Sequence, residues 1–600
     1  MALTTIVHEC DLCVVGGGLA GMCAAIAAAR GGSRVVIMQD RPVFGGNASS
    51  EIRMWVCGSD GGDNRETGII EEIQLESLYA NPDKNYAIWD GILYGKIREE
   101  ENITPLLNCS CMDAKTEERN GEKIITEITG WQTTTQKFHT VRARLFADCS
   151  GDSILAPLTG AEFRVGREAR EEFGEKTSQE TADSQTMGMS CLLQCRKTSK
   201  ATKFIPPVWA KKMTPEVIAL RRPNMNNTGE NFWYLELGGN RDSIGDTEDV
   251  REELVSLAYG MFDWIKNSGE VPDADYWSLD FLGFLPGKRE SRRMVGDYIM
   301  CQGDVLAGGR FPDTVAFGGW PLDDHHPDGF YHRGNPNVWG STPAPYGIPY
   351  RCLYSKNIGN LFFAGRNISM THAAMSSARV MATCATLGEA VGTAANIARE
   401  FDTSPRGVYL EHIGLLQQRL MENGCFLPRV KRTIPSFVRE AELISPDGGT
   451  MENLRNGIDR TNRIWGAVDQ GVTIPLGSAA GYRFRKPVRI ENVHLALDSD
   501  LARATLPGDD CERRHTMRAN VWWDDPGKSP TMTMPATLVK SYRIEGITEN
   551  GKTVVLAKES CNRLQCVNVR CDRTLAQLTF IPLALWGAGD AAHVFSFDAR

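Results

Sequence analysis

The chain has 600 residues, enough for several domains, and the composition of a globular protein, with 42% hydrophobic and 24% charged residues. Its 66 basic and 75 acidic residues give a net charge of −9 with no basic block, which argues against nucleic-acid binding and a polybasic membrane anchor. No run of about 18 apolar residues and no cleavable leader pattern appears, so we expect a cytoplasmic protein without a membrane partner, whose 17 cysteines are reduced thiols.

The chain begins with a pattern of strand, tight turn, helix and strand, the first strand starting near residue 10. The turn reads Gly16-Gly-Gly18-Leu-Ala-Gly21 and leads into an alanine-rich helix that ends at Arg30. Gly16 lets the chain turn, Gly18 lets the backbone approach a pyrophosphate, and Gly21 lets the helix pack closely on the sheet. The helix would also aim its free N–H groups at the phosphates. An ordinary strand-to-helix turn is the alternative, but the context that this motif requires favours a dinucleotide site.

A second glycine-rich segment follows the second strand directly. A nicotinamide domain has no need of such a loop, whereas an FAD site does, because the flavin end of the cofactor must pass it. The position that usually carries a ribose-binding acid holds an amide, with an acid one place later, and either side chain could face the adenosine. The sequence therefore predicts FAD, with contacts at Gln39, Asp40, Arg41, Gly45, Gly46, Asn47, Ala48 and Ser49.

The next segments predict two helices and a three-stranded meander. The helices are expected over residues 67–79 and 89–100, and the strands over 103–112, 123–131 and 137–147, with a hairpin turn at Asn120-Gly121. The last strand runs into Asp148-Cys-Ser150-Gly151-Asp152. A buried strand that ends in small residues and an acid is where a chain closes over a dinucleotide, so we expect Ser150, Gly151 and Asp152 to touch the cofactor.

The rest of the chain predicts an insertion, a return to the first domain and a separate tail. Residues 161–340 are rich in Trp, Gly and Pro, whereas a strand at 361–366 and helices at 376–399 and 408–424 follow. The tail has short alternating segments, at 493–497, 516–523 and 554–556. The predicted fold is α/β, a Rossmann-like FAD-binding domain with an inserted α+β substrate domain and a C-terminal β-sandwich. The predicted divisions are 1–160 with 341–400, 161–340, a helical connector 401–443, and 444–600.

Two cysteine groups have alternative interpretations. His8, Cys10 and Cys13 resemble a fragment of a metal site, but the cysteines begin a buried strand and no second pair accompanies them. Cys191 and Cys195 could form a redox pair, although apolar surroundings favour core cysteines. We therefore predict no metal site.

The motifs in this order resemble the bacterial FAD-dependent oxidoreductases of the glutathione-reductase structural class, near the succinate dehydrogenase and fumarate reductase flavoproteins. The resemblance covers roughly residues 8–430, and it is specific for FAD and unspecific for substrate. The segments that carry it, besides the glycine loops and Asp148 to Asp152, are Asn360 to Arg366, Gly287 to Arg293, Gly318 to Trp320, Ile348 to Arg351, and Ser369 to Val380.

The resemblance implies how the cofactor is held. Gly365 and Arg366 would cover the pyrophosphate and ribityl chain, and the helix from about Ser376, with Ser377, would point its positive end at the flavin. No second glycine fingerprint and no C-x4-C pair follow the first one, so a second dinucleotide domain is not expected. No histidine follows the Gly45-Gly46 loop, so we expect non-covalent FAD.

Histidines and arginines at the motif positions are the catalytic candidates. His372 lies between the Gly365 loop and the following helix, so we expect it to line the active site as an acid or base. His325 and His326 follow Asp323-Asp324, and they are either a proton-transferring pair, a surface pair or a metal fragment. Arg289 and Arg351 either bind an anionic or polyhydroxylated ligand or belong to solvated charge runs.

These features predict hydride transfer from a hydroxyl-bearing carbon of a sugar-like or polyol substrate to the flavin. One alternative is fumarate-reductase-like reduction of a C=C bond beside a carboxylate. Another is an FAD-containing protein that recognises glycans through Trp522 and Trp523 without turnover. The electron acceptor and the oligomeric state are left open.

Overall fold

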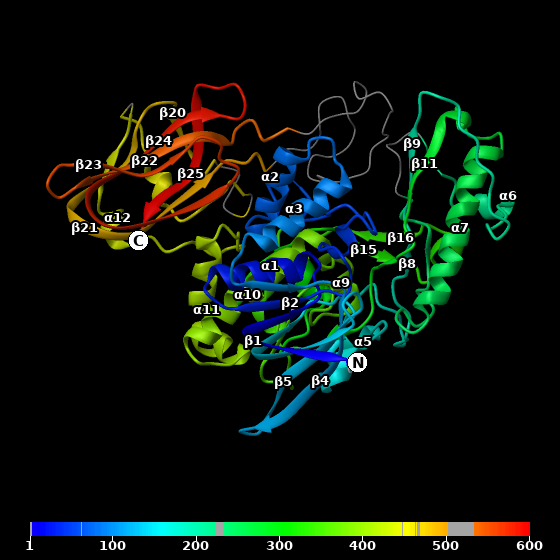
Figure 1. Ribbon diagram of the computed structural model, residues 1–600. Coiled ribbons are helices and arrows are strands. Elements are labelled where there is room, and N and C mark those ends of the chain that lie inside the picture. The colour runs from blue at the N-terminus through cyan, green and yellow to red at the C-terminus, as the bar shows by residue number, and fades with distance from the viewer. Residues whose placement is uncertain are drawn as a thin grey trace.

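The computed structural model describes residues 3–61, 63–223, 225, 232–446, 448–462, 464, 469–501 and 533–600. The strand expected at 516–523, with Trp522 and Trp523, lies outside these residues. No helix in the described part of the chain is both long and apolar enough to cross a membrane. Figure 1 shows a central α/β body flanked on one side by the strands of the C-terminal part and on the other by an extension that contains α7, β9 and β11.

The central sheet has the order β3-β2-β1-β6-β5-β4, and β18 pairs with β6 off this path. Strands β3, β2, β1, β6 and β18 are parallel to one another. β6 also pairs with β5 in an antiparallel meander of β4, β5 and β6. The carboxyl ends of the parallel strands therefore meet at one edge, where open α/β sheets bind ligands. The strands are β1 (Thr4–Val15), β2 (Val35–Met38), β3 (Ile103–Leu106), β4 (Cys109–Arg119), β5 (Glu122–Gln132), β6 (Lys137–Asp148) and β18 (Leu361–Phe363).

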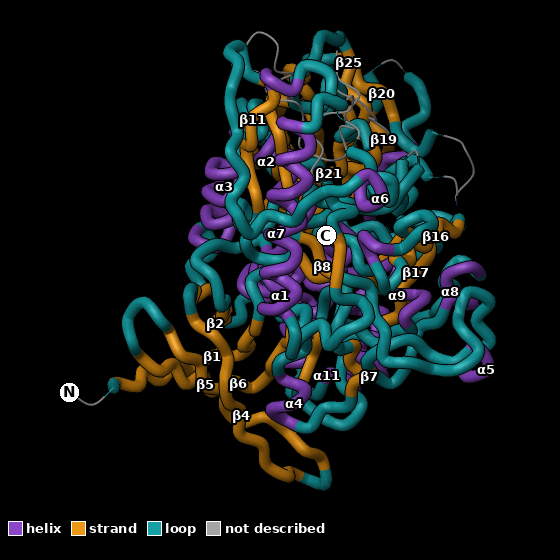
Figure 2. Tube along the Cα trace, turned by 90° about the vertical axis from the view of Figure 1, so that its right-hand side faces the viewer, coloured by secondary structure: helices purple, strands orange, loops and turns teal. Residues whose placement is uncertain are grey.

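Two predicted strand boundaries were wrong. β1 begins at Thr4 rather than near residue 10, because its first half pairs with β6 at the exposed end of the sheet. The run expected over 103–112 is two strands, since Asn108 adopts a left-handed φ of 53° between them. A hairpin turn at Asn120-Gly121 joins β4 to β5, both residues having the positive φ that a tight hairpin turn requires, and this hairpin projects from the body (Figure 2).

Small residues let two helices pack closely against each other beside the sheet. α1 (Leu19–Arg30) lies along α10 (Met381–Glu400), and a Cβ added to Gly388 would come within 1.9 Å of the Ala20 carbonyl oxygen. The helix predicted from Ser376 is divided into α9 (His372–Ala378) and α10, which corrects the position of the helix start. The other helices of this part are α2 (Ile69–Ala80), α3 (Tyr86–Arg98), α4 (Leu155–Thr159), α8 (Gln302–Leu306) and α11 (Pro405–Glu422).

The extension has a hydrophobic core of its own, built on α7 (Thr247–Asn267) with short strands. Cys191 and Cys195 lie inside this core, and burial raises the pKa of the Cys191 thiol to about 12, which supports the core interpretation. Residues 294–316 instead pack into the core of the central body. The strands of the extension are β8 (Met189–Ser190), β9 (Leu193–Lys197), β10 (Glu236–Leu237), β11 (Trp277–Leu282) and β12 (Gly287–Lys288).

The C-terminal part is an antiparallel β-sandwich, and its hydrophobic core also includes Leu75 and Leu78 of α2. Its strands follow the order β20-β25-β21-β24-β22-β23, and β19 (Glu442–Ile444) pairs with β21. The segments predicted at 493–497 and 554–556 lie in β21 and β23, so these two expectations are confirmed. The other strands are β20 (Val472–Pro475), β21 (Ala480–Leu497), β22 (Val539–Thr548), β23 (Thr553–Glu559), β24 (Cys566–Leu585) and β25 (Ala591–Ala599).

Candidate functional site

A cavity of about 1210 Å³ opens at the carboxyl ends of β1, β2 and β6 and continues to the extension. One end is formed by the two glycine segments, by residues 149–152 and by Gly365 and Arg366. The other end is formed by β15 (Leu322–His325) and by three tryptophans, Trp233, Trp320 and Trp339. The first end has the features of a dinucleotide site, and the second has the side chains for a substrate.

The two glycine segments form a cradle whose open space matches a pyrophosphate. Gly17 and Gly45 are joined by a hydrogen bond of 2.8 Å from the Gly45 N–H to the Gly17 carbonyl oxygen. A Cβ on Gly16 would come within 2.3 Å of the Cys149 carbonyl oxygen, whereas a Cβ on Gly18 would meet nothing closer than 3.9 Å. The packing of the protein backbone thus requires glycine at position 16, whereas Gly18 leaves room at the N-terminus of α1 for a ligand. The residues present fit FAD.

Gln39 and Asp40, which follow β2, have different roles in the cavity wall. The buried Gln39 accepts a hydrogen bond from the Gly17 N–H at 2.8 Å and donates one to the Val43 carbonyl oxygen at 3.1 Å. Its amide therefore braces the glycine loop. Asp40 also lines the cavity, and its side chain is mostly exposed beside Arg41.

An ion cluster closes the cavity over the cofactor end. Asp152 accepts hydrogen bonds from Arg366 at 2.6 Å, from Lys288 at 2.8 Å and from Ser291 at 2.7 Å. Burial would raise the pKa of Asp152, but Arg366 and Lys288 hold it below its usual range. The Nε atom of Arg366 is buried without a hydrogen-bond partner in the described structure, so one donor at this wall is available to a ligand.

Not every predicted cofactor residue lines the cavity. Ser376 donates to the Ala373 carbonyl oxygen, and the buried Ser377 donates to the Trp320 carbonyl oxygen. The helix whose N-terminus reaches the cavity is α10, through Val380 and Met381, because α9 and α10 are separate helices. Gly21, Ala48 and Ser49 were also predicted, and they are buried without lining the cavity.

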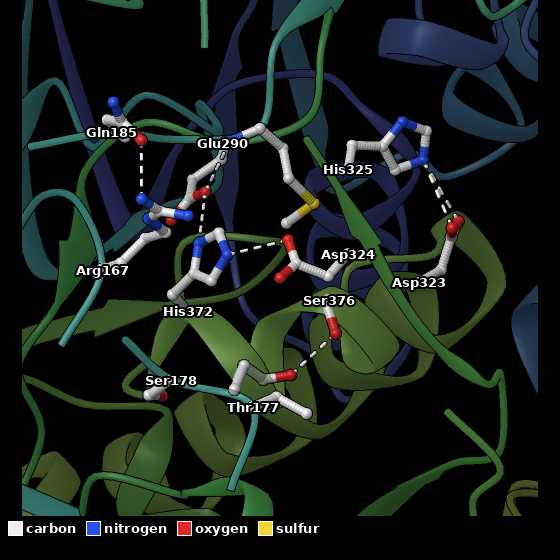
Figure 3. Close-up of polar contacts among 12 residues, drawn as sticks. Arg167, Thr177, Ser178, Gln185, Glu290, Asp323, Asp324, His325, His372 and Ser376 are labelled. Carbon is white, nitrogen blue, oxygen red and sulfur yellow. Dashed lines mark hydrogen bonds and ion pairs between the residues drawn. The ribbon is translucent and has the colours of Figure 1, made fainter. Parts of the chain in front are cut away.

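His325 is the only histidine among the described residues that lines the cavity. Its Nδ1 lies 2.6 Å from the Glu236 carboxylate. Its Nε2 lies 3.4 Å from Asp323, as Figure 3 shows. Burial would raise the pKa of Glu236, but the charge of Arg289 and the hydrogen bond with His325 hold it below its usual range. A buried carboxylate at Nδ1 fixes the ring orientation and leaves Nε2 for proton exchange.

Paired charges surround His325. Arg289 lies 3.4 Å from Glu236, and Arg379 lies 3.3 Å from Asp323. Asp323 also accepts a hydrogen bond from the Asn337 amide at 2.5 Å. Glu236 and Arg379 were not among the predicted site residues. Arg379 belongs to a motif noted in the sequence, whereas nothing in the sequence near Glu236 indicated its pairing with His325.

His372 does not line the cavity, which corrects the expectation from the sequence. It is buried with Nδ1 2.8 Å from Glu290 and Nε2 2.9 Å from Asp324 (Figure 3). Burial alone would lower the pKa of His372, but these two carboxylates raise it to about 10. Glu290 also pairs with the buried Arg293. His372 is therefore a structural cation at neutral pH.

The two remaining catalytic candidates also lie outside the cavity. Arg351 forms a bidentate ion pair with Asp313, with N–O distances of 2.9 and 3.0 Å. His326 stacks on His332 with ring centroids 3.6 Å apart, and these two with Asp328 place potential metal-ligand atoms within 4.8 Å of one another. Neighbouring residues on β15 alternate in direction, which separates His325 from Asp324 and from the His372 cluster.

The buried cation at His372 predicts a pH-dependent contribution to stability. The folded pKa of about 10 exceeds the ordinary value of 6.5, so the contribution is full below about pH 6.5 and is lost as pH rises through about 10. We expect His372→Gln to lower the free energy of unfolding at pH 6.5 by about 3 kcal/mol, since it removes the cation that Glu290 and Asp324 share.

The measurement is thermal unfolding of wild type and variant from pH 6.5 to 10, with the half-exposed His326→Gln as control. The difference between wild type and His372→Gln should shrink over this range. A difference that is independent of pH would contradict the charged state of His372.

Comparison with protein families matches the part of the chain that carries the cavity. Residues 11–420 match the protein family described as FAD dependent oxidoreductase, and every residue that lines the cavity falls within this span. Similar solved structures include the quinol fumarate reductase FrdA of E. coli, with 12% identity, coverage of 70% of this chain and 75% of that chain, and a TM-score of 0.27. A geranylgeranyl bacteriochlorophyll reductase-like protein from Thermoplasma acidophilum has 12% identity, coverage of 70% and 85%, and a TM-score of 0.31.

A family 32 carbohydrate-binding module from Streptococcus pneumoniae EndoD has 11% identity, covers 27% of this chain and 97% of its own, and has a TM-score of 0.19. A search of curated protein sequences found no match.

Proposed function

The chain belongs to the FAD-dependent oxidoreductase family, and on that premise we propose that it oxidises a hydroxyl-bearing carbon of a neutral, sugar-like or polyol substrate. The cofactor would lie along the glycine cradle, with the substrate between it and the wall that carries His325. FAD, when bound, supplies the two-electron acceptor for this oxidation. The residues that would hold it are Gly16, Gly18, Asp40, Gly45, Gly46, Asn47, Asp152, Gly365 and Arg366.

The ion pairs beside His325 are the observation that favours a neutral substrate over an anionic one. Arg289 and Arg379 each have a carboxylate partner within 3.4 Å, so neither is a free cation awaiting an anionic ligand. Binding a carboxylate here would require one of these ion pairs to open and take the arginine away from a buried carboxylate, which is costly. A neutral ligand instead adds hydrogen bonds without disturbing them.

The walls of this end suit a polyhydroxylated ring or chain. Trp233, Trp320 and Trp339 present aromatic surface, on which the apolar face of a sugar packs. The Nε1 of Trp320 and the Nε of Arg379 are buried without hydrogen-bond partners in the described structure, so each can donate to a substrate oxygen.

His325 would take the proton of the substrate hydroxyl as the carbon is oxidised. In the neutral form of His325 that this reaction requires, Nδ1–H would donate to Glu236 and the lone pair of Nε2 would be left for the substrate, whose hydroxyl would replace the 3.4 Å contact to Asp323. The imidazolium that forms would be stabilised by Glu236. The proton thus moves onto a group that the protein has already oriented.

An anaerobic experiment separates this reaction from the alternatives. Mixing the oxidised holoenzyme with sugars and polyols should bleach the visible absorbance of the flavin. Reoxidation of chemically reduced enzyme by enoates, without bleaching by polyols, would favour C=C reduction instead. Absence of any redox response would favour a binding protein.

We also propose that the FAD is non-covalent, because no histidine follows the Gly45-Gly46 loop. Acid precipitation should then release the flavin quantitatively into the supernatant. Flavin that stays with the precipitate would contradict this and would direct attention to the thiols that line the cavity, Cys57 and Cys384 among them.

A further inference from the structure

The segment that follows the second glycine loop forms part of the cavity wall. Met54, Trp55 and Cys57 line the cavity, and the Cys57 carbonyl oxygen accepts a hydrogen bond of 2.9 Å from the Ala382 N–H at the start of α10. The Asp60 N–H donates to the Gly319 carbonyl oxygen at 3.1 Å, one residue before Trp320. Residues 54–60 therefore join the two ends of the cavity.

A buried carboxylate holds this segment from behind. Glu66 accepts hydrogen bonds from the Ser59 N–H at 2.9 and 3.0 Å and from the Thr383 hydroxyl at 2.8 Å. Glu66 is 1% exposed. Its position thus fixes both the segment and the first turn of α10, and it depends on what holds residues 63–66.

Arg460, which follows the connector, holds residues 63–66. Its Nη2 donates to the carbonyl oxygens of Asp63 and Arg65, both at 2.7 Å. The guanidinium lies 4.7 Å from the ring centroid of Phe426 and 5.9 Å from that of Phe317, on β14 (Thr314–Gly318). Arg460 is buried, so this contact is dry and geometrically fixed.

Asp459, the residue before Arg460, binds toward the C-terminal sandwich. Asp459 accepts a hydrogen bond from Arg432 Nε at 3.0 Å, and Arg432 also forms an ion pair with Asp598 of β25 at 2.6 Å. Two adjacent residues thus bind in opposite directions, Asp459 toward the C-terminal sandwich and Arg460 toward the wall of the cavity.

We propose that Arg460 is a positioning residue through which the C-terminal sandwich sets the shape of the flavin side of the cavity. The chain of contacts runs from Asp598 through Arg432, Asp459 and Arg460 to the backbone of residues 63–65, and from there to the segment that carries Trp55. The inference rests on the proposed function only for the place of the flavin, which serves as the reporter.

A second contact between the sandwich and the central body provides the matched control. Arg563 pairs with Glu76 of α2 at 2.7 Å and stacks on Tyr79, whose ring packs on Trp586. None of these residues lines the cavity. Removing Arg563 thus weakens the attachment of the sandwich without touching the wall.

The experiment compares Arg460→Met, Arg460→Lys and Arg563→Met as full-length holoenzymes. All three should lower the unfolding temperature. Arg460→Met should also weaken FAD binding at least ~10-fold and change the shape of the visible flavin band, since the flavin wall shifts. Arg460→Lys, which retains the charge and can reach one carbonyl, should give the same spectral change at smaller amplitude. Arg563→Met should bind FAD with wild-type affinity and spectrum.

A flavin spectrum and FAD affinity that are unchanged in Arg460→Lys or Arg460→Met, or changed equally in Arg563→Met, would overturn the inference. If Arg460→Met does not fold, Arg460→Lys alone decides the question by the same spectrum. Failure of the proposed function would be recognised separately, because wild type would then show no redox response to polyols while the comparison of FAD affinities still stands.

Discussion

Replacing His325 by Asn should leave FAD bound and slow the reduction of the flavin by substrate at least ~100-fold, the usual scale for a lost general base. Asn keeps a polar side chain that can donate to Glu236, but it cannot accept the proton of a hydroxyl. The rate is measured by anaerobic stopped-flow, following the bleaching of the flavin. FAD content and unfolding temperature are measured in parallel, because a partly unsatisfied Glu236 costs about 1–3 kcal/mol.

Two further variants make this result specific. His326→Asn changes the neighbouring histidine, which lies outside the cavity, and should reduce the flavin at the wild-type rate. Glu236→Gln should slow reduction less than His325→Asn, since it removes the partner that orients the ring rather than the base itself. Wild-type kinetics in His325→Asn would remove His325 from the chemistry, and the base would then have to be sought elsewhere on the cavity wall.

Gly18→Val should abolish FAD retention in a protein that still folds. Gly18 has an ordinary φ of −67°, and a Cβ there meets no protein atom closer than 3.9 Å, so the backbone of the folded chain tolerates a side chain at this position. The branched side chain would instead occupy the space at the N-terminus of α1 that the pyrophosphate needs. We expect at least ~100-fold weaker binding of FAD, measured by equilibrium dialysis or fluorescence titration.

Two other glycines show whether the effect belongs to the cradle. Gly91→Val on α3 has open space and lies outside the cavity, so FAD affinity should stay at the wild-type value. Gly21→Ala should instead lower stability, because its Cβ would come within 1.9 Å of the Gly16 carbonyl oxygen. FAD binding by Gly18→Val at wild-type strength would refute the placement of the pyrophosphate.

The sequence was most informative where function depends on the local backbone. The glycines near residues 16 and 45 predicted the cradle, because the turn, the close approach and the helix start are all encoded within a few residues. The strand that ends at Asp148 was recognisable for the same reason. The helix start was misplaced because the break between α9 and α10 contains no proline or glycine, only Arg379 and Val380.

The choice among histidines could not be made from the sequence. His372 lies at a position that the family motif favours, but Glu290 and Asp324, 82 and 48 residues away, turn it into a buried cation. His325 gains its orienting carboxylate from Glu236, which is 89 residues distant on another strand. Such pairings depend on how the extension folds onto the central body, and periodicity and composition do not reveal them.

The most direct test of the account compares neutral and anionic forms of one substrate skeleton. Oxidised holoenzyme is mixed anaerobically with a panel of sugar alcohols and with the matching sugar acids, in which a terminal hydroxymethyl group is replaced by a carboxylate, and flavin bleaching is followed. Because Arg289 and Arg379 are already paired, at least one neutral compound should bleach the flavin faster than its acid. Faster bleaching by the acids throughout the panel, or the absence of bleaching by every neutral compound, would contradict the proposal of a neutral substrate.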